Sequence, residues 1–134
     1  MDLQGPLDKS ILGYTYTLGV IDDHSQKGWK EFLQHKDEAP DLIKTLIQQL
    51  ETYTGQQVKI VHSDHGREFI NAKLGTYFKQ KGILHEYTAP HTPQQNGVAE
   101  RFNQTTHESA LAMLEDAEMS KGFWPEAHEY ANYV

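Results

Sequence analysis

Hydrophobic and polar positions alternate along the first part of the chain in the manner of β-strands. Residues 14–21 are rich in aromatic and β-branched side chains, and residues 29–33 have the same character, which is typical of strands. The segment Asp22-Asp23-His24-Ser25 between them is suited to an Asx-type turn. We therefore expect an antiparallel hairpin, and we interpret this acidic pair as turn-forming, not as a second catalytic site.

Three later segments have the spacing of amphipathic helices. Asp41 can cap a helix over residues 42–54, and Asn71 can cap another that ends near Gly82. A third, longer helix follows Asn96-Gly97, and its apolar or small positions step by three and four, which predicts one buried stripe. The stripe consists of Ala99, Phe102, Thr106, Ser109, Ala110, Met113 and Ala117. An adjacent face, off the core, would then carry Glu100, Asn103, Gln104 and His107.

Two shorter segments complete a pattern in which strands and helices alternate. Residues 58–63 are nearly all apolar, as in a central parallel strand, and residues 83–87 form another short strand. Residues 88–97 contain two prolines and a glycine without hydrophobic periodicity, which indicates a loop. The expected order is three strands, a helix, a strand, a helix, a strand and further helices, which is an α/β fold.

The composition narrows the class of protein. At 134 residues with 37% apolar content, the chain has the size of one domain with its own core. It has no apolar run long enough to span a membrane and no leader sequence, so we expect an intracellular, soluble protein. The absence of cysteine excludes disulfides and thiolate zinc sites. A net charge of -7 argues against a free-standing nucleic-acid binder, because phosphate contacts need clustered Lys and Arg.

Two acidic residues occupy positions at which side chains from separate elements can meet. Asp64 closes the apolar segment 58–63, and Glu100 lies on the first turn of the long helix, with 35 residues between them. With a third carboxylate, for which Asp2 is the candidate, they could hold a divalent metal ion. The spacing alone is weak evidence, because the chain has 19 acidic residues. His62 and His65 flank Asp64, but strand alternation divides their side chains between faces, which disfavours a zinc site.

Longer motifs around these acids resemble a known family. The matching segments are Asp2-Leu3-Gln4-Gly5-Pro6, Ile21-Asp22-Asp23-His24-Ser25 with Trp29, residues 62–69, Gly82-Ile83 with His85-Glu86, and Phe123-Trp124-Pro125-Glu126-Ala127. The most specific segment is Pro90-His91-Thr92-Pro93-Gln94-Gln95-Asn96-Gly97-Val98-Ala99-Glu100-Arg101-Phe102-Asn103. On these motifs, the whole chain resembles the catalytic core of retroviral-type integrases, and it is most similar to the copia-type branch of LTR retrotransposons.

The resemblance implies a fold, a site and its ligands. The implied fold is RNase H-like, a five-stranded mixed β-sheet flanked by α-helices, with residues 1–134 as one integrase catalytic core domain. The family's triad falls at Asp2, Asp64 and Glu100, which would hold two Mg²⁺ or Mn²⁺ ions. Residues implied to contact DNA are Gln95, Asn96, Arg101 and Asn103. The family's N-terminal zinc module and C-terminal basic region lie outside this sequence, so we interpret it as a core or a fragment of a polyprotein.

The implied activity is metal-dependent polynucleotidyl transfer, which trims DNA 3′ ends and joins them to target DNA. The expected partners are double-stranded DNA, from the element ends and the target, and a second copy of the core in a homodimer, with no membrane. The expected location is the nucleus or a virus-like particle. Two alternatives stay open: a catalytically inert remnant that dimerises or binds DNA, and an RNase H-like nuclease.

Overall fold

The structure is a computed structural model of the chain. It describes residues 1–88 and 97–133. The chain forms two compact units: unit 1 comprises Met1–His35 and Gly97–Val134, and unit 2 comprises Lys36–Asn96. The expected order of strands and helices is confirmed. In the described residues, no helix is both long and apolar enough to cross a membrane.

Unit 1 is built on a three-stranded antiparallel sheet. β1 (Asp2–Gln4), β2 (Tyr16–Ile21) and β3 (Gly28–Leu33) are arranged in that order, with β2 in the centre. β2 and β3 form the expected hairpin. The Asx-type turn is confirmed, because Asp22 Oδ2 accepts hydrogen bonds from the backbone N–H (2.9 Å) and the hydroxyl (2.6 Å) of Ser25. These bonds lower the pKa of the Asp22 carboxyl below its ordinary value.

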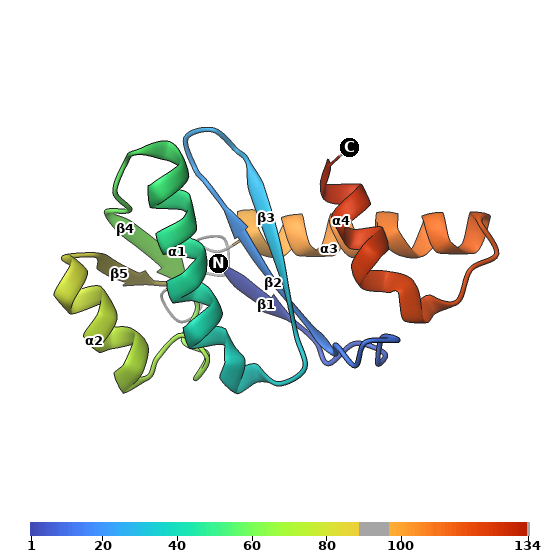
Figure 1. The fold of residues 1–134 in the computed structure, drawn as a ribbon, viewed down its shortest axis with the longest axis horizontal. Coiled ribbons are helices and arrows are strands. Elements are labelled where there is room, and N and C mark those ends of the chain that lie inside the picture. Colours follow the sequence, from blue (N-terminus) through green and yellow to red (C-terminus); the bar gives the residue numbers. More distant parts are fainter. Residues whose placement is uncertain (89–96, 134) are drawn as a thin grey trace. The chain divides into compact units, whose positions relative to one another are not determined.

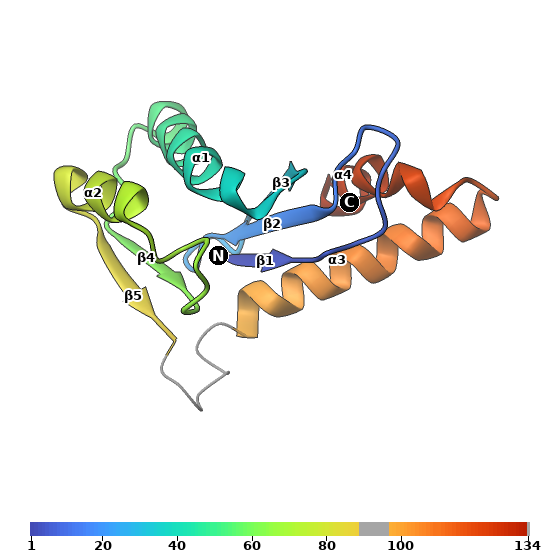
Figure 2. The same ribbon diagram turned by 90° about the horizontal axis from the view of Figure 1, so that it is seen from below.

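Two helices cover the sheet of unit 1. α3 (Gly97–Asp116) packs against β1 and β2, and Figure 2 shows it running beside β1. α4 (Trp124–Tyr133) follows the 3-10 turn η3 (Lys121–Phe123) and packs against α3 and β3 (Figure 1). Trp124 is buried between these layers, where its ring packs against Phe32 of β3. Full burial of a large apolar side chain stabilises the folded state by about 1.5–3 kcal/mol.

The buried face of α3 differs from the expected one. Its buried residues are Ala99, Asn103, Thr106, Ala110 and Leu114. In the predicted stripe, Ser109 is exposed and Ala117 lies beyond the end of the helix, so those two assignments are wrong. Asn103, expected off the core, is only 1% exposed. A hydrophobic pattern assigns polar residues to the exposed face of a helix. A polar side chain is nevertheless tolerated in the core wherever it finds hydrogen-bond partners.

Unit 2 contains a two-stranded parallel sheet and two helices. β4 (Ile60–Ser63) pairs with β5 (Leu84–Tyr87). α1 (Ala39–Thr54) follows the 3-10 turn η1 (Lys36–Glu38) and packs against α2 (Ala72–Lys81), which also packs against β5. Figure 2 shows both helices on the same side of these strands.

Of the two helices in unit 2, α2 begins where expected and α1 does not. Asn71 caps α2 as expected, because its side chain accepts a hydrogen bond from the backbone N–H of Leu74 at 2.9 Å. α1, however, begins at Ala39 and not after Asp41, with Pro40 in its first turn. Proline is tolerated there because the first N–H groups of a helix have no intrahelical acceptor. Asp41 pairs instead with Lys73, with 2.6 Å between carboxylate and ammonium.

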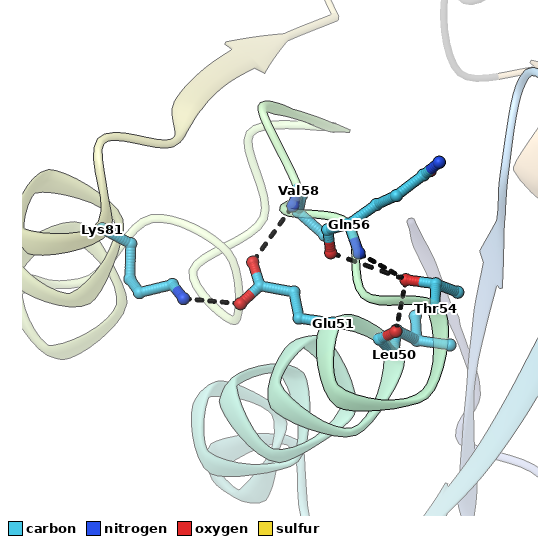
Figure 3. A network of polar contacts seen from close by, with 6 residues as sticks. All are labelled: Leu50, Glu51, Thr54, Gln56, Val58 and Lys81. Atoms are coloured by element: carbon cyan, nitrogen blue, oxygen red, sulfur yellow. Dashed lines mark hydrogen bonds and ion pairs between the residues drawn. The ribbon is translucent and has the colours of Figure 1, made fainter.

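Glu51 joins the end of α1 to the following chain and to α2 (Figure 3). Its carboxylate accepts a hydrogen bond from the backbone N–H of Val58 (3.0 Å) and pairs with Lys81 Nζ (2.5 Å). The Thr54 hydroxyl accepts a hydrogen bond from the backbone N–H of Gln56 (3.2 Å). These bonds fix the connection between α1 and β4.

The expected five strands are present, but the described residues place them in two sheets, one in each unit. The α/β class and the mixture of parallel and antiparallel pairs are confirmed, whereas one continuous five-stranded sheet is not seen. The burial expected for residues 58–63 is also wrong in part. Val61 and Ser63 are buried, but Ile60 and His62 are exposed, which is the alternation of a strand with one covered face.

Candidate active site

Asp2 is held at the start of β1 by a side chain from α3. In the sheet it pairs with Gly19 of β2, and it is half-buried. The side-chain amide of Asn103 donates hydrogen bonds to the backbone oxygen and to Oδ2 of Asp2, each at 2.9 Å. Two bonds from one amide fix the rotation of the Asp2 carboxylate relative to its own backbone, as hydrogen bonds to metal-binding carboxylates commonly do.

Lys30 of β3 contacts the other end of the same amide. Its Nζ donates a hydrogen bond to Asn103 Oδ1, and it lies 4.9 Å from the centre of the Phe102 ring, within cation–π range. Burial lowers the pKa of Lys30 to about 7, an effect that the negative charge of Asp2 partly opposes. Burying an ammonium group is costly unless it is paired. Lys30 is stabilised by its hydrogen bond to Asn103 and by the nearby negative charge of Asp2.

Glu100 lies one helical turn before Asn103 on α3. It is exposed, as expected. Residues three apart are neighbours on a helix surface, with their Cβ atoms roughly 5–6 Å apart. Glu100 therefore lies one helical turn along α3 from Asn103, the residue that holds Asp2. Unit 1 thus contains two of the three predicted triad positions, one on β1 and one on the first turn of α3.

Asp64 directly follows β4 in unit 2, as expected. Its Oδ1 accepts a hydrogen bond from the backbone N–H of Gly66 at 2.8 Å. The buried Ser63 hydroxyl lies 2.9 Å from the backbone oxygen of Asp64 and 2.7 Å from Nε2 of His85. Because a carbonyl oxygen only accepts, the hydroxyl proton is donated to Asp64, and His85 Nε2–H donates to the hydroxyl. Burial lowers the pKa of His85 to about 4, so this ring is neutral at pH 7.

The predicted triad is divided between the two units. Asp2 and Glu100 belong to unit 1 and Asp64 to unit 2, so their convergence on shared ions stays a prediction. Within either unit, the described residues include no group of three or more histidine or acidic side chains able to enclose a metal ion. The chemistry of the donors nevertheless fits Mg²⁺ or Mn²⁺, which prefer hard carboxylate oxygens. Neutral N–H groups orient two of these carboxylates, those of Asp2 and Asp64.

The residues expected to contact DNA have different positions. Arg101 is exposed on α3 and lines a cavity of about 370 Å³ together with Phe102 and Asn132. Asn103 is buried and bound to Asp2, so its expected position off the core is wrong, and its contact with DNA stays a prediction. Gln95 and Asn96 lie outside the described residues.

The two histidines beside Asp64 have other contacts. His62 Nε2 lies 3.2 Å from a carboxylate oxygen of Glu86, its cross-strand partner on β5. The His65 ring stacks on Tyr87, with 5.1 Å between ring centres. Both rings therefore contact side chains of β5.

The sequence patterns gave no role to Lys30, Ser63 or His85. One signal for Lys30 was available, because alternation along β3 places it on the same face as Phe32, and Phe32 packs against Trp124. A lysine on the covered face of a strand needs a polar partner. No comparable signal marks Ser63 and His85, because their contact depends on the register between β4 and β5.

Comparison with known proteins agrees with these features. Two family models, both described as Integrase core domain, match residues 3–93 and 81–121. The chain is 39% identical over 134 residues to the Retrovirus-related Pol polyprotein from transposon TNT 1-94 of Nicotiana tabacum, covering 99% of this chain and 10% of that protein. It is 32% identical over 121 residues to the corresponding polyprotein from transposon RE1 of Arabidopsis thaliana, covering 90% and 8%. The chain therefore spans about a tenth of the length of the curated relatives it matches.

Solved structures show the same fold. A chain of the simian T-cell lymphotropic virus intasome, in complex with PP2A regulatory subunit B56 gamma, has a TM-score of 0.74 at 16% identity, covering 98% of this chain and 45% of that one. The catalytic core domain of BIV integrase has a TM-score of 0.67 at 20% identity, covering 98% and 78%. The resemblance to retroviral-type integrase cores and to copia-type elements is thus confirmed. By sequence and by fold, the chain belongs to the integrase core domain family.

Proposed function

We propose that this chain is the catalytic core of a retrotransposon integrase and that it catalyses metal-dependent phosphoryl transfer on DNA. The observation that carries the proposal is the attachment of Asp2 to α3 through Asn103, one helical turn from Glu100. Asp2 and Glu100 come from distant parts of the sequence, and both belong to unit 1. Unit 2 supplies Asp64 at the end of β4, oriented by Gly66.

The chemistry explains why carboxylates are needed. In phosphodiester transfer, negative charge develops on the attacking, leaving and nonbridging oxygens. Two Mg²⁺ or Mn²⁺ ions roughly 4 Å apart would stabilise both ends of an in-line displacement. In this proposal Asp64 contributes to both ion sites, and Asp2 and Glu100 contribute to one each.

The proposed activity consists of two transfers at one site. In the first, a water oxygen attacks a phosphorus near the end of the element DNA, the P–O3′ bond breaks, and the departing oxygen becomes a 3′ hydroxyl. In the second, that hydroxyl oxygen attacks a phosphorus of the target DNA and displaces the target's own O3′. Each transfer replaces one P–O bond by another, so no covalent enzyme intermediate is needed.

Double-stranded DNA is the proposed partner, from the element ends and from the target. Arg101 is an exposed cation next to Glu100 in the sequence and can contact a phosphate, and Gln95 and Asn96 stay candidates for contact with the DNA end. Because the net charge is -7, we expect other parts of a longer protein to supply most of the phosphate contacts. A homodimer, and a location in the nucleus or a virus-like particle, complete the proposal.

A branched DNA that mimics the product of strand transfer tests the proposed activity. With Mn²⁺, residues 1–134 should splice this substrate by reversing the transfer, and gel electrophoresis should resolve the joined strand. Asp64→Asn and Glu100→Gln each remove a metal ligand, and we expect losses of about a hundredfold or more, because metal ions contribute several kcal/mol to such reactions. Glu115→Gln, at an exposed position of the same helix, is the matched control and should retain activity.

The same experiment separates the alternatives. Cleavage without joining would indicate an RNase H-like nuclease. Absence of any reaction, together with Mn²⁺ binding that Asp64→Asn leaves unchanged in calorimetric titration, would indicate an inert remnant.

A further inference from the structure

We infer that Lys30 is a positioning residue for Asp2 and that it acts through the side-chain amide of Asn103. The inference rests on the proposed function only for the consequence, metal binding by Asp2. The arrangement itself is a property of unit 1, in which all three residues lie. Nothing in the hydrophobic pattern of β3 requires a lysine at this position.

The sheet register brings Asp2 and Lys30 to the two sides of one glycine. Gly19 of β2 pairs with Asp2 on β1 and with Lys30 on β3. Side chains directly opposite each other in neighbouring antiparallel strands point to the same face of the sheet. Asp2 and Lys30 therefore project to one face, with the missing side chain of Gly19 between them.

Asn103 of α3 occupies the space that Gly19 leaves. A Cβ atom at position 19 would lie 2.2 Å from Oδ1 and 2.8 Å from Cγ of Asn103, far inside van der Waals contact. Asn103 is 1% exposed, and its amide contacts Lys30 at one end and Asp2 at the other. The absence of a side chain at position 19 is thus what allows the helix residue to reach both strands.

The hydrogen-bonding capacity of each group allows only one orientation of the amide. The backbone oxygen of Asp2 can only accept, so the atom of Asn103 that faces it must be the donor, Nδ2. Oδ1 then faces Lys30, whose Nζ carries N–H groups in either protonation state. Lys30 is therefore the donor that keeps Oδ1 satisfied and Nδ2 directed at Asp2.

Loss of this donor has a predictable consequence. A buried acceptor without a partner is costly, and rotation of the Asn103 side chain away from Asp2 would relieve that cost. The Asp2 carboxylate would then lose the bond that fixes its rotation. When a residue that hydrogen-bonds to a metal ligand is mutated, metal affinity typically falls about 10–100-fold.

Two substitutions of Lys30 separate positioning from packing. Lys30→Met keeps a long unbranched side chain but removes the donor, whereas Lys30→Gln keeps an N–H donor on a shorter side chain. We expect Lys30→Met to raise the Mn²⁺ concentration for half-maximal splicing by about tenfold, and Lys30→Gln to restore much of the loss. Asn103→Asp replaces the Nδ2 donor by a second carboxylate and should be at least as damaging. Gln104→Glu, the same chemical change at the exposed next residue, is its control.

Nuclear magnetic resonance of the metal-free protein gives a readout that does not depend on activity. The side-chain NH₂ protons of Asn103 should be shifted and protected from exchange in the wild type, because they are buried and hydrogen-bonded. Lys30→Met should remove that protection, and Lys30→Gln should retain it. Unfolding by urea, measured in parallel, reports any general loss of stability.

The outcomes of the two measurements are distinguishable. Unchanged Asn103 resonances in Lys30→Met would overturn the inference, as would a loss of stability with an unchanged Mn²⁺ requirement. If the wild type neither binds Mn²⁺ nor splices DNA, the proposed function fails. The Asn103 resonances would still decide whether Lys30 positions the amide.

Discussion

Nε2 of His85, on β5, lies 2.7 Å from the hydroxyl of Ser63, the last residue of β4. The hydroxyl in turn lies 2.9 Å from the backbone oxygen of Asp64. The backbone of a candidate metal ligand is therefore tied to the neighbouring parallel strand, in addition to the ladder between the strands. Asp2 is held differently, by an amide from a helix.

Ser63→Ala tests the contribution of this contact to stability. The change removes a fully buried hydroxyl and leaves two polar groups without their partner, so we expect the free energy of unfolding to fall by about 1–3 kcal/mol. Urea denaturation monitored by circular dichroism measures this change. A double-mutant cycle that combines Ser63→Ala with His85→Phe measures the interaction energy between the two side chains. We expect a coupling of at least about 0.5 kcal/mol. If the effects of the two substitutions on the free energy of unfolding simply add, the hydrogen bond between Ser63 and His85 is contradicted.

Gly19→Ala and Gly75→Ala should have opposite effects on stability. At position 19 the added Cβ meets the buried Asn103 amide at 2.2 Å, and such overpacking typically costs about 1–3 kcal/mol. At position 75, inside α2, a Cβ meets nothing within 4 Å, and Gly→Ala in a helix interior typically gains about 0.5–1 kcal/mol. Thermal or urea unfolding of the two variants provides the comparison. Tolerance of Gly19→Ala without loss would contradict the close approach of Asn103 to β2.

His128 should make the stability of the protein fall in mild acid. Its side chain is fully buried, packed against Trp124, with Nε2 2.9 Å from Nδ1 of His107. Burial, assisted by the nearby charges of Lys30 and His107, lowers the pKa of His128 from 6.5 to about 3. The unfolded chain therefore binds a proton that the folded protein excludes. This contribution to stability is complete above pH 6.5 and is lost as pH falls toward 3, by up to about 1.4 kcal/mol per pH unit.

Urea unfolding at a series of pH values measures this effect. The difference in unfolding free energy between the wild type and His128→Gln should shrink as pH falls from 6.5 to 3, because the variant lacks the group that titrates. His24→Gln, in the exposed hairpin turn, is the matched control for replacing a histidine outside the core. If the difference in unfolding free energy between wild type and His128→Gln does not change with pH, the lowered pKa of His128 in the folded protein is contradicted.

Glu51 should contribute more to stability than its partner Lys81. Glu51→Ala removes the acceptor for the backbone N–H of Val58 as well as the ion pair (Figure 3), and loss of one such hydrogen bond costs about 1 kcal/mol. Lys81→Ala removes only the ion pair, which lies near the surface and contributes little. The hydrogen bond to Lys81, followed by that to Val58, lowers the pKa of Glu51, so its contribution is present at neutral pH and lost in acid. Equal effects of the two substitutions at pH 7 would contradict this ranking.

Much of the fold could be predicted because it depends on local sequence. The hairpin at Asp22, the cap at Asn71 and the long helix from Gly97 all have signals within a few residues of the structure they specify. The start of α1 was misjudged because Pro40 is as acceptable in a first helical turn as Asp41 is at a cap. The buried face of α3 was misjudged because hydrophobicity does not reveal that Asn103 has partners on β1 and β3.

The sequence by itself determined the order of elements, the family, and three candidate acids, Asp2, Asp64 and Glu100, because turn, cap and motif residues are read over short distances. Only the tertiary structure decided what surrounds those acids. Lys30 and Asn103 are 73 residues apart, and Asn103 and Asp2 are 101 apart. Such contacts follow from strand register and from the approach of a helix to a glycine, and no short stretch of sequence encodes either.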